Sequence, residues 1–167
     1  MVKKILKITG ITLLVIVIGL VAAPFIFKDK IKEMIAKTLN ERVDAKVAFE
    51  DVDLSLLKSF PQANVTIDKL SIINKAPFEG DTLFYSGETN LKMSIKELFK
   101  DATETINLES ISAENAIVNI IFNKDGVGNY DIALKDDSPE TESDSKPFAL
   151  NIQDYKVENL RFMYLDQ

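Results

Sequence analysis

The longest apolar pattern in the chain is an uncharged run of 20 residues from Ile8 to Phe27. As an α-helix this run would be about 30 Å long, which matches the hydrocarbon core of a bilayer. A helix also satisfies its own backbone N–H and C=O groups in lipid. The pattern therefore predicts one transmembrane helix over 8–27. The basic start at 1–7 has three lysines and no acid, which keeps it in the cytoplasm and exports the rest of the chain.

A cleaved signal peptide is the alternative interpretation, because it also has a basic start and an apolar middle. Its apolar region is usually about 7–15 residues long, shorter than this run. The small-residue site Val21-Ala22-Ala23 is followed by Pro24, which is unfavourable directly after a cleavage site. Both features favour a retained, single-pass anchor. A buried soluble helix fits less well, because it rarely needs apolar residues all around.

Segment 28–43 continues with a helical rather than a fully apolar pattern. Asp29 can cap a new helix, and the pattern predicts a short amphipathic helix over 29–42. Its apolar stripe consists of Ile31, Met34, Ile35 and Leu39. This helix lies in the outer membrane–water boundary, plugs the end of a β structure, or buries its stripe on the exported domain. All three arrangements place it between anchor and sheet.

From residue 44 onward the pattern changes to the two-residue alternation of β-strands. Region 44–167 is predicted to be one antiparallel β domain. Its expected strands are 46–53, 64–74, 82–85, 89–95, 105–111, 116–122, 129–134, 148–152 and 156–165. A helical turn is expected over 95–99 and a hairpin turn over 123–126. Segment 135–146 has no aliphatic or aromatic residue, so a mobile acidic loop is expected there.

A loose repeat runs through the strand region. Residues 108–120 and 152–164 each contain a strand, a short polar break and a second strand. In both copies an acidic residue and an asparagine precede the second strand, and residues 68–72 form a partial third copy. The alternation slips by one residue near Asp68-Lys69, which indicates a bulge or bend. Such units, placed side by side, build a long sheet whose apolar face continues from one unit to the next.

Composition narrows the classes of function. The net charge is −6, and without the three lysines of the anchor region 17 basic residues face 26 acidic ones, a net charge of −9. An acidic body argues against binding nucleic acid through a basic patch. The chain has no Cys, His or Trp, so the usual zinc ligands and the commonest general base are missing. No catalytic residue, metal site or cofactor is predicted.

The acidic pairs have ordinary explanations. Asp51 with Asp53 fits the solvated end of a strand, and Asp125 with Asp131 fits turn chemistry. The acids within 136–144 lack the glycine-punctuated spacing of a calcium loop. An enzyme is therefore the least favoured class.

The order of motifs resembles the N-terminal region of the AsmA family, over nearly the whole chain. After the basic start, the anchor and the short helix, the motifs that carry the resemblance are Val52-Asp53-Leu54-Ser55-Leu56, Ser59-Phe60-Pro61, Leu70-Ser71-Ile72-Ile73-Asn74, Asn123-Lys124-Asp125-Gly126, Asn129-Tyr130-Asp131 and the strand from Val157 to Asp166. The chain differs from typical members in being much shorter. It is expected either to close a sheet edge at Gln167 or to be the first piece of a longer protein.

The resemblance implies an inner-membrane protein of the Gram-negative envelope whose main domain is periplasmic. Members of this family are similar to bridge-like lipid-transfer proteins, in which a curved β-sheet forms an open apolar groove for phospholipid acyl chains. The implied role is phospholipid transport or outer-membrane assembly and homeostasis. The implied partners are membrane lipids, with envelope proteins or a C-terminal continuation as further ones.

Strand parity selects the residues expected to face such a groove. They are Val65, Ile67, Leu70, Ile72, Ile106, Leu108, Val118, Ile120 and Phe122. An ordinary sheet core, covered by another layer, explains the same alternation. A third interpretation is an anchored interaction module that docks an envelope protein by strand addition at its last edge.

Overall fold

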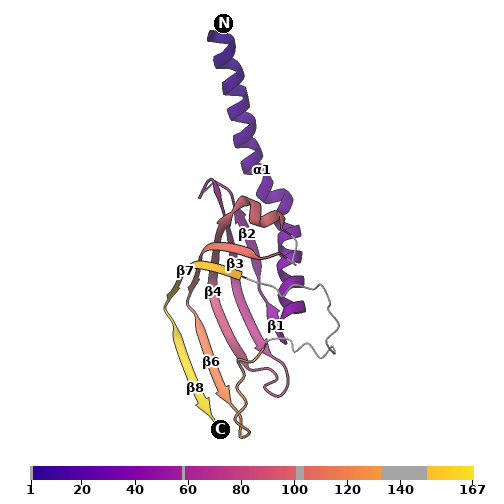
Figure 1. The fold of residues 1–167 in the computed structure, drawn as a ribbon, viewed down its shortest axis with the longest axis vertical. Coiled ribbons are helices and arrows are strands. Elements are labelled where there is room, and N and C mark those ends of the chain that lie inside the picture. Colours follow the sequence, from indigo (N-terminus) through magenta and orange to yellow (C-terminus); the bar gives the residue numbers. More distant parts are fainter. Residues whose placement is uncertain (1, 58, 101–103, 133–149) are drawn as a thin grey trace.

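A computed structural model describes residues 2–57, 59–100, 104–132 and 150–167 (Figure 1). The protein is mainly β, with one long apolar helix at the N-terminus, as the sequence predicts. The elements are α1 (Val2–Arg42), β1 (Ala45–Ala48), β2 (Asp51–Ser55), β3 (Gln62–Asn74), β4 (Thr82–Ser94), the 3₁₀ helix η1 (Ile95–Phe99), β5 (Ile106–Glu114), β6 (Ile117–Phe122), β7 (Leu150–Glu158) and β8 (Arg161–Asp166).

The strands form one open sheet that does not close into a barrel. β1 and β2 lie end to end along β3, β4 follows β3, and β5 and β6 both pair with β4. β7 and β8 complete the other side, against β5 and β6. The sheet thus consists of long bent ribbons, and Figure 1 shows its curvature.

The prediction of an antiparallel sheet is wrong, because the sheet is mixed. β7 runs parallel to β5, and β8 runs parallel to β6. The chain leaves β6 at one end of the sheet and re-enters at the start of β7, so the second ribbon repeats the direction of the first. Alternation of apolar and polar residues has the same period in both directions, and therefore carries no information about strand direction.

The predicted break between the anchor and a separate amphipathic helix is also absent. α1 is continuous from Val2 to Arg42 with Pro24 inside it, so Asp29 does not cap a new helix. Proline is tolerated within long apolar helices, where neighbouring groups compensate for the missing N–H. The N-terminal part is long and apolar enough to cross a membrane, and none of its most apolar stretch is buried in the protein. A signal sequence would meet the same criterion.

Several strand boundaries differ from the predicted ones. The strands predicted over 82–85 and 89–95 are one strand, β4, which continues through Ser86 and Gly87 and ends at Ser94, before η1 begins at Ile95. The expected return strand over 129–134 is wrong for the residues that are described, because 129–132 form a turn and an irregular segment, and the isolated bridge to Phe122 is made by Gly128, just before them. The turn before it is present, with Gly126 N–H donating to the Asn123 carbonyl at 2.9 Å. The helical turn over 95–99 is confirmed as η1. The acidic segment 135–146 lies outside the described residues.

Three residues with positive φ mark a line along which the sheet bends. They are Lys69 (φ 51°), Asn115 (φ 53°) and Asn159 (φ 52°), the residues that follow the acids of the sequence repeat. Asn115 separates β5 from β6, and Asn159 separates β7 from β8. The slip predicted near Asp68-Lys69 is therefore a bend at a left-handed residue.

The alternation of side chains between the two faces shifts at the bend. In a straight strand, residues three apart point to opposite faces. Here Ser86 and Thr89 contact each other through their side-chain hydroxyls at 2.5 Å, so both point to the same face of β4. On the neighbouring ribbon Ala113 and Ala116 are both buried. Between the members of each pair, the alternation of side chains therefore shifts by one residue.

Candidate functional site on the inner face of the sheet

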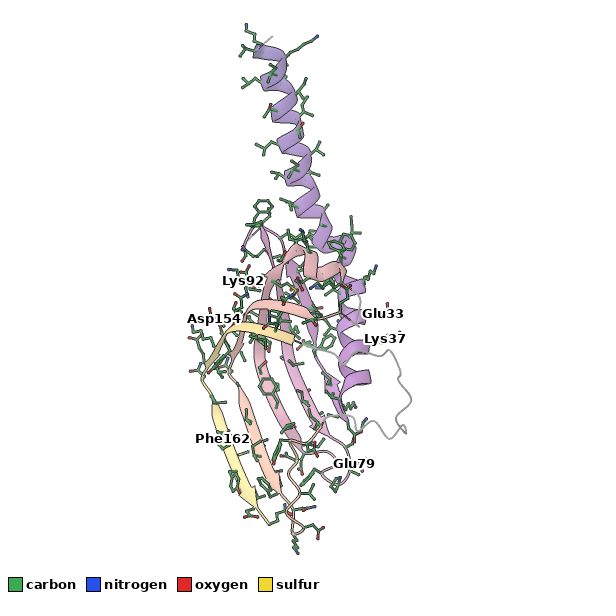
Figure 2. The ribbon with its side chains drawn as sticks, viewed as in Figure 1. Glu33, Lys37, Glu79, Lys92, Asp154 and Phe162 are labelled. Atoms are coloured by element: carbon green, nitrogen blue, oxygen red, sulfur yellow. The ribbon has the colours of Figure 1, made fainter. Side chains whose placement is uncertain are left out.

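The second half of α1 covers part of one face of the sheet, which we call the inner face. Ile31 of α1 is buried in one cluster with residues of four strands: Val52, Leu54, Leu56, Ala63, Val65, Ile67, Met93 and Leu108. Ile35 of α1 packs against the same cluster, whereas Glu33 and Lys37 are exposed (Figure 2). Of the stripe predicted for this segment, the side chains of Met34 and Leu39 lie outside those described.

Three of the residues predicted to line a groove are thus part of a closed core. Val65 is 1%, Ile67 3% and Leu108 2% exposed, and all three belong to the cluster under α1. Leu70 and Ile106 are half-buried and pack against its rim. On this part of the sheet the core interpretation accounts for the apolar alternation.

Beyond the bend the inner face is less covered. Ile72, Val118, Ile120 and Phe122, the remaining predicted residues, are all half-buried. Pairing aligns Val47, Ile72, Phe84, Val118 and Phe162 in one row across the sheet. Residues directly opposite each other in neighbouring strands share a face, so this row is a continuous apolar strip. It ends at Phe162 on the edge strand (Figure 2).

The edge ribbon β7–β8 carries exposed apolar side chains that were not among the predicted site residues. Leu160 is 52%, Phe162 59% and Tyr164 60% exposed. Tyr164 contacts the ring of Phe122, with 5.7 Å between the ring centroids, and thereby joins the same surface. Their alternation is visible in the sequence, but only the pairing of β8 with β6 places them beside Val118 and Ile120.

A buried asparagine network at the far end of the sheet was also missed. Asn129 is 2% exposed and Asn74 is 5% exposed. The Asn129 Nδ2 donates to Asn74 Oδ1 at 3.2 Å and to the Asn119 carbonyl at 2.9 Å. Its Oδ1 accepts from the N–H of Ile121 at 2.9 Å. Asn129 lies in a turn, yet its side chain makes hydrogen bonds with the backbone of β6 that a neighbouring strand would otherwise make.

A charge cluster fixes α1 to the sheet directly after the uncharged run. Lys28 Nζ lies 2.7 Å from Asp51 Oδ2 and 2.9 Å from Asp53 Oδ1. Lys32 Nζ lies 3.4 Å from Asp51 Oδ1 and donates to the Glu50 carbonyl at 3.2 Å. The hydrogen bond from Lys28 is the main cause that lowers the pKa of Asp51 to about 2. The acidic pair therefore has a structural role.

The described residues contain no group of three or more acidic side chains that could hold a metal ion. None of the protein-family models, curated proteins or solved structures compared with this chain matches it.

Proposed function

We propose that this protein is a membrane-anchored, non-enzymatic lipid-handling protein whose inner sheet face holds acyl chains. α1 anchors it, with residues 1–7 in the cytoplasm and the β domain in the periplasm of a Gram-negative envelope. The resemblance to the AsmA family, drawn from the order of sequence motifs, suggests phospholipid transport or outer-membrane assembly and homeostasis as the process served.

One observation carries the proposal: the apolar strip of the inner face continues past the part covered by α1. The row from Val47 to Phe162 contains only apolar residues, and its last member is 59% exposed. Each CH₂ group moved from water onto such a surface gains up to about 0.8 kcal/mol. An acyl chain lacks hydrogen-bonding groups and would leave none unsatisfied there. A polar substrate would lose its hydration without finding partners.

The test uses the two faces of β6. A photo-crosslinking residue is placed at Ile120, on the face shared with Val118, and separately at Ile121, on the opposite face. The full chain is expressed in a Gram-negative envelope and irradiated. Phospholipid attached at position 120 but not at 121 supports a lipid-binding inner face. Absence of lipid at 120 contradicts the proposal.

A second candidate function, docking of an envelope protein by strand addition, is favoured by the edge ribbon β7–β8. Within the described part of the chain it pairs on one side, with β5 and β6. Asn151 and Asn159 donate their Nδ2 groups to Asn107 and Asn115 at 3.3 and 3.2 Å. Within the described residues, no donor contacts the Oδ1 atoms of Asn151 and Asn159. A further strand could extend both ladders. Protein adducts without lipid in the crosslinking experiment would support this function.

A further inference from the structure

We infer that the end of the β-sheet nearest the anchor is itself inserted into the lipid surface of the membrane that α1 enters. The inserted group comprises Leu57 and Phe60, from the turn between β2 and β3, and Phe99 at the end of η1. These three side chains are 51%, 60% and 67% exposed. The inference depends on α1 being a membrane anchor, and it holds whether or not the inner face carries lipid.

Strand register brings the three side chains to one end of the sheet. Gln62, the first residue of β3, pairs with Ser94, the last residue of β4. The turn that contains Phe60 therefore lies beside η1, which begins directly after Ser94. Figure 1 shows the β2–β3 turn and η1 at the end of the sheet from which the N-terminal part of α1 leaves.

Two contacts place this end at the depth of the lipid boundary. The ring of Phe99 meets the ring of Phe27 edge-on, with 5.9 Å between the centroids. Phe27 is the last residue of the uncharged run, and Lys28 follows it. Leu20 and Ala23, which lie within that run, pack against the core cluster of the sheet. Leu20 lies about 10 Å from Phe27 along the helix, toward the N-terminus and thus deeper in the uncharged run. A membrane that covers the uncharged run must therefore reach the adjoining end of the sheet.

The occupant of this surface follows from that continuity. Phenylalanine and leucine side chains left in water are unfavourable, and those next to a membrane span gain by entering the acyl–headgroup boundary. Lys28 and Lys32 lie on the other side of Phe27, where their charges meet Asp51 and Asp53 instead of lipid. Along α1, the uncharged run, the contact of Phe27 with Phe99 and the charge cluster thus follow one another in the order lipid core, lipid boundary and water.

The experiment uses the absence of tryptophan from the chain. The single variants Phe60→Trp, Phe99→Trp, Met163→Trp and Ile16→Trp are reconstituted as full chains in phosphatidylcholine vesicles. Met163 is 50% exposed and serves as the reference, because it lies on the face of β8 opposite to Phe162 and the inner face. A series of lipids brominated at different acyl positions quenches tryptophan according to its depth. Far-ultraviolet circular dichroism of each variant, matched to the unsubstituted chain, verifies that the fold is retained.

The expected result is quenching of the Phe60→Trp and Phe99→Trp variants at least twofold stronger than that of Met163→Trp, with the greatest effect from bromines near the glycerol end. The Ile16→Trp variant should respond most to bromines near the bilayer centre. Quenching of the first two variants that is no stronger than that of Met163→Trp would overturn the inference, and so would an unquenched Ile16→Trp variant.

A second measurement does not depend on tolerance of tryptophan. The chain has no cysteine, so Leu57→Cys carries a single spin label whose collisions with oxygen and with a water-soluble nickel complex report its depth. Greater accessibility to oxygen than to nickel supports insertion, and the reverse contradicts it. These readouts are independent of crosslinking at Ile120, so insertion and lipid handling can fail separately.

Discussion

The Nδ2 of Asn159 donates a hydrogen bond of 3.2 Å to the Oδ1 of Asn115, a residue 44 positions earlier in the chain. Both residues have left-handed backbone conformations, and the N–H of Asn115 also donates to the carbonyl of Glu158 at 3.0 Å. Pairing keeps the same offset on both sides of the bend, from Ile106 with Leu150 to Phe122 with Asp166. The second copy of the sequence repeat thus lies in register on the first.

Replacing Asn115 should show how much the bend depends on its conformation. Asn115→Val is expected to lower the free energy of unfolding by about 2–3 kcal/mol, since a β-branched residue is strained at positive φ and the side-chain hydrogen bond is lost. Asn115→Gly should lose only about 0.5–1.5 kcal/mol, because glycine adopts this conformation freely. Urea unfolding of the full chain in detergent, followed by circular dichroism, measures both.

Asn107→Val is the matched control for the bend. Asn107 accepts the equivalent hydrogen bond from Asn151 at 3.3 Å, but it lies in the extended strand β5, where valine is favourable. A loss at Asn107 as large as that at Asn115 would mean that the hydrogen bond, not the left-handed conformation, determines the cost.

The sequence predicted the bend at Asp68-Lys69 but not the direction of the strands, and the other two bends follow the polar breaks of the repeat. A shift of alternation at Asp68-Lys69, and an acid followed by asparagine before a strand, are local signals of a bend. The parallel pairing of β7 with β5 depends on where the chain re-enters the sheet, which no local pattern encodes. The same limit applies to the groove, because coverage of Val65 and Ile67 depends on how Ile31 of a continuous α1 packs over them.

Asn129 shows another limit of sequence reasoning. The residue belongs to a stretch predicted as a strand, yet it lies in a turn. Its side-chain Oδ1 accepts a hydrogen bond from the backbone N–H of Ile121 in β6. Asparagine is frequent in turns, where it is usually exposed, and composition alone does not distinguish a buried asparagine from those. The apolar alternation of β6 and β8 can be seen in the sequence. The exposure of the β8 side chains could not be predicted from it, because it depends on how β8 pairs within the sheet.

Removal of the Asn129 side chain should be strongly destabilising. Asn129→Ala removes the partners of the Ile121 N–H and the Asn74 Oδ1, while the Asn74 Nδ2 keeps its bond to the main-chain carbonyl of residue 129, so a loss of about 2–4 kcal/mol in the free energy of unfolding is expected. Asn151→Ala, which removes one exposed hydrogen bond, should cost less than about 1 kcal/mol. Equal losses in urea unfolding would show that the network does not stabilise the fold.

The contact of α1 with β2 should respond to acid. The pKa of Asp51 is lowered from 3.8 to about 2, mainly by the hydrogen bond from Lys28. A carboxyl group with a lowered pKa in the folded state stabilises the fold fully above its unfolded pKa, and that stabilisation is lost as the pH falls through the folded pKa. Asp51→Asn should therefore reduce the thermal midpoint at neutral pH, and its difference from the unsubstituted chain should shrink between about pH 4 and pH 2.

Asp53→Asn is the control for the charge cluster. Asp53 is more exposed than Asp51, and among the described residues its ion pair is with Lys28, so its replacement should have a smaller effect at every pH. Thermal unfolding of the full chain in detergent, repeated at several pH values, gives both comparisons. A difference for Asp51→Asn that stays constant down to about pH 2 would contradict the assignment of the lowered pKa to this contact.

Substitutions at two exposed residues of β8 can distinguish lipid binding by the inner face from lipid contact with the apolar edge as a whole. Phe162 is 59% exposed and ends the apolar row of the inner face, whereas Met163 is 50% exposed and alternates to the opposite face. Glutamate at either position should lower the free energy of unfolding by a similar amount, about 1–2 kcal/mol, because about half of each side chain is buried. Phe162→Glu, however, places a charge beside Val118, where an acyl chain would lose its apolar contact. Lipid crosslinking at Ile120 is therefore expected to fall at least threefold with Phe162→Glu and to stay unchanged with Met163→Glu. An equal decrease for both would show that crosslinking depends on the edge as a whole and not on the inner face.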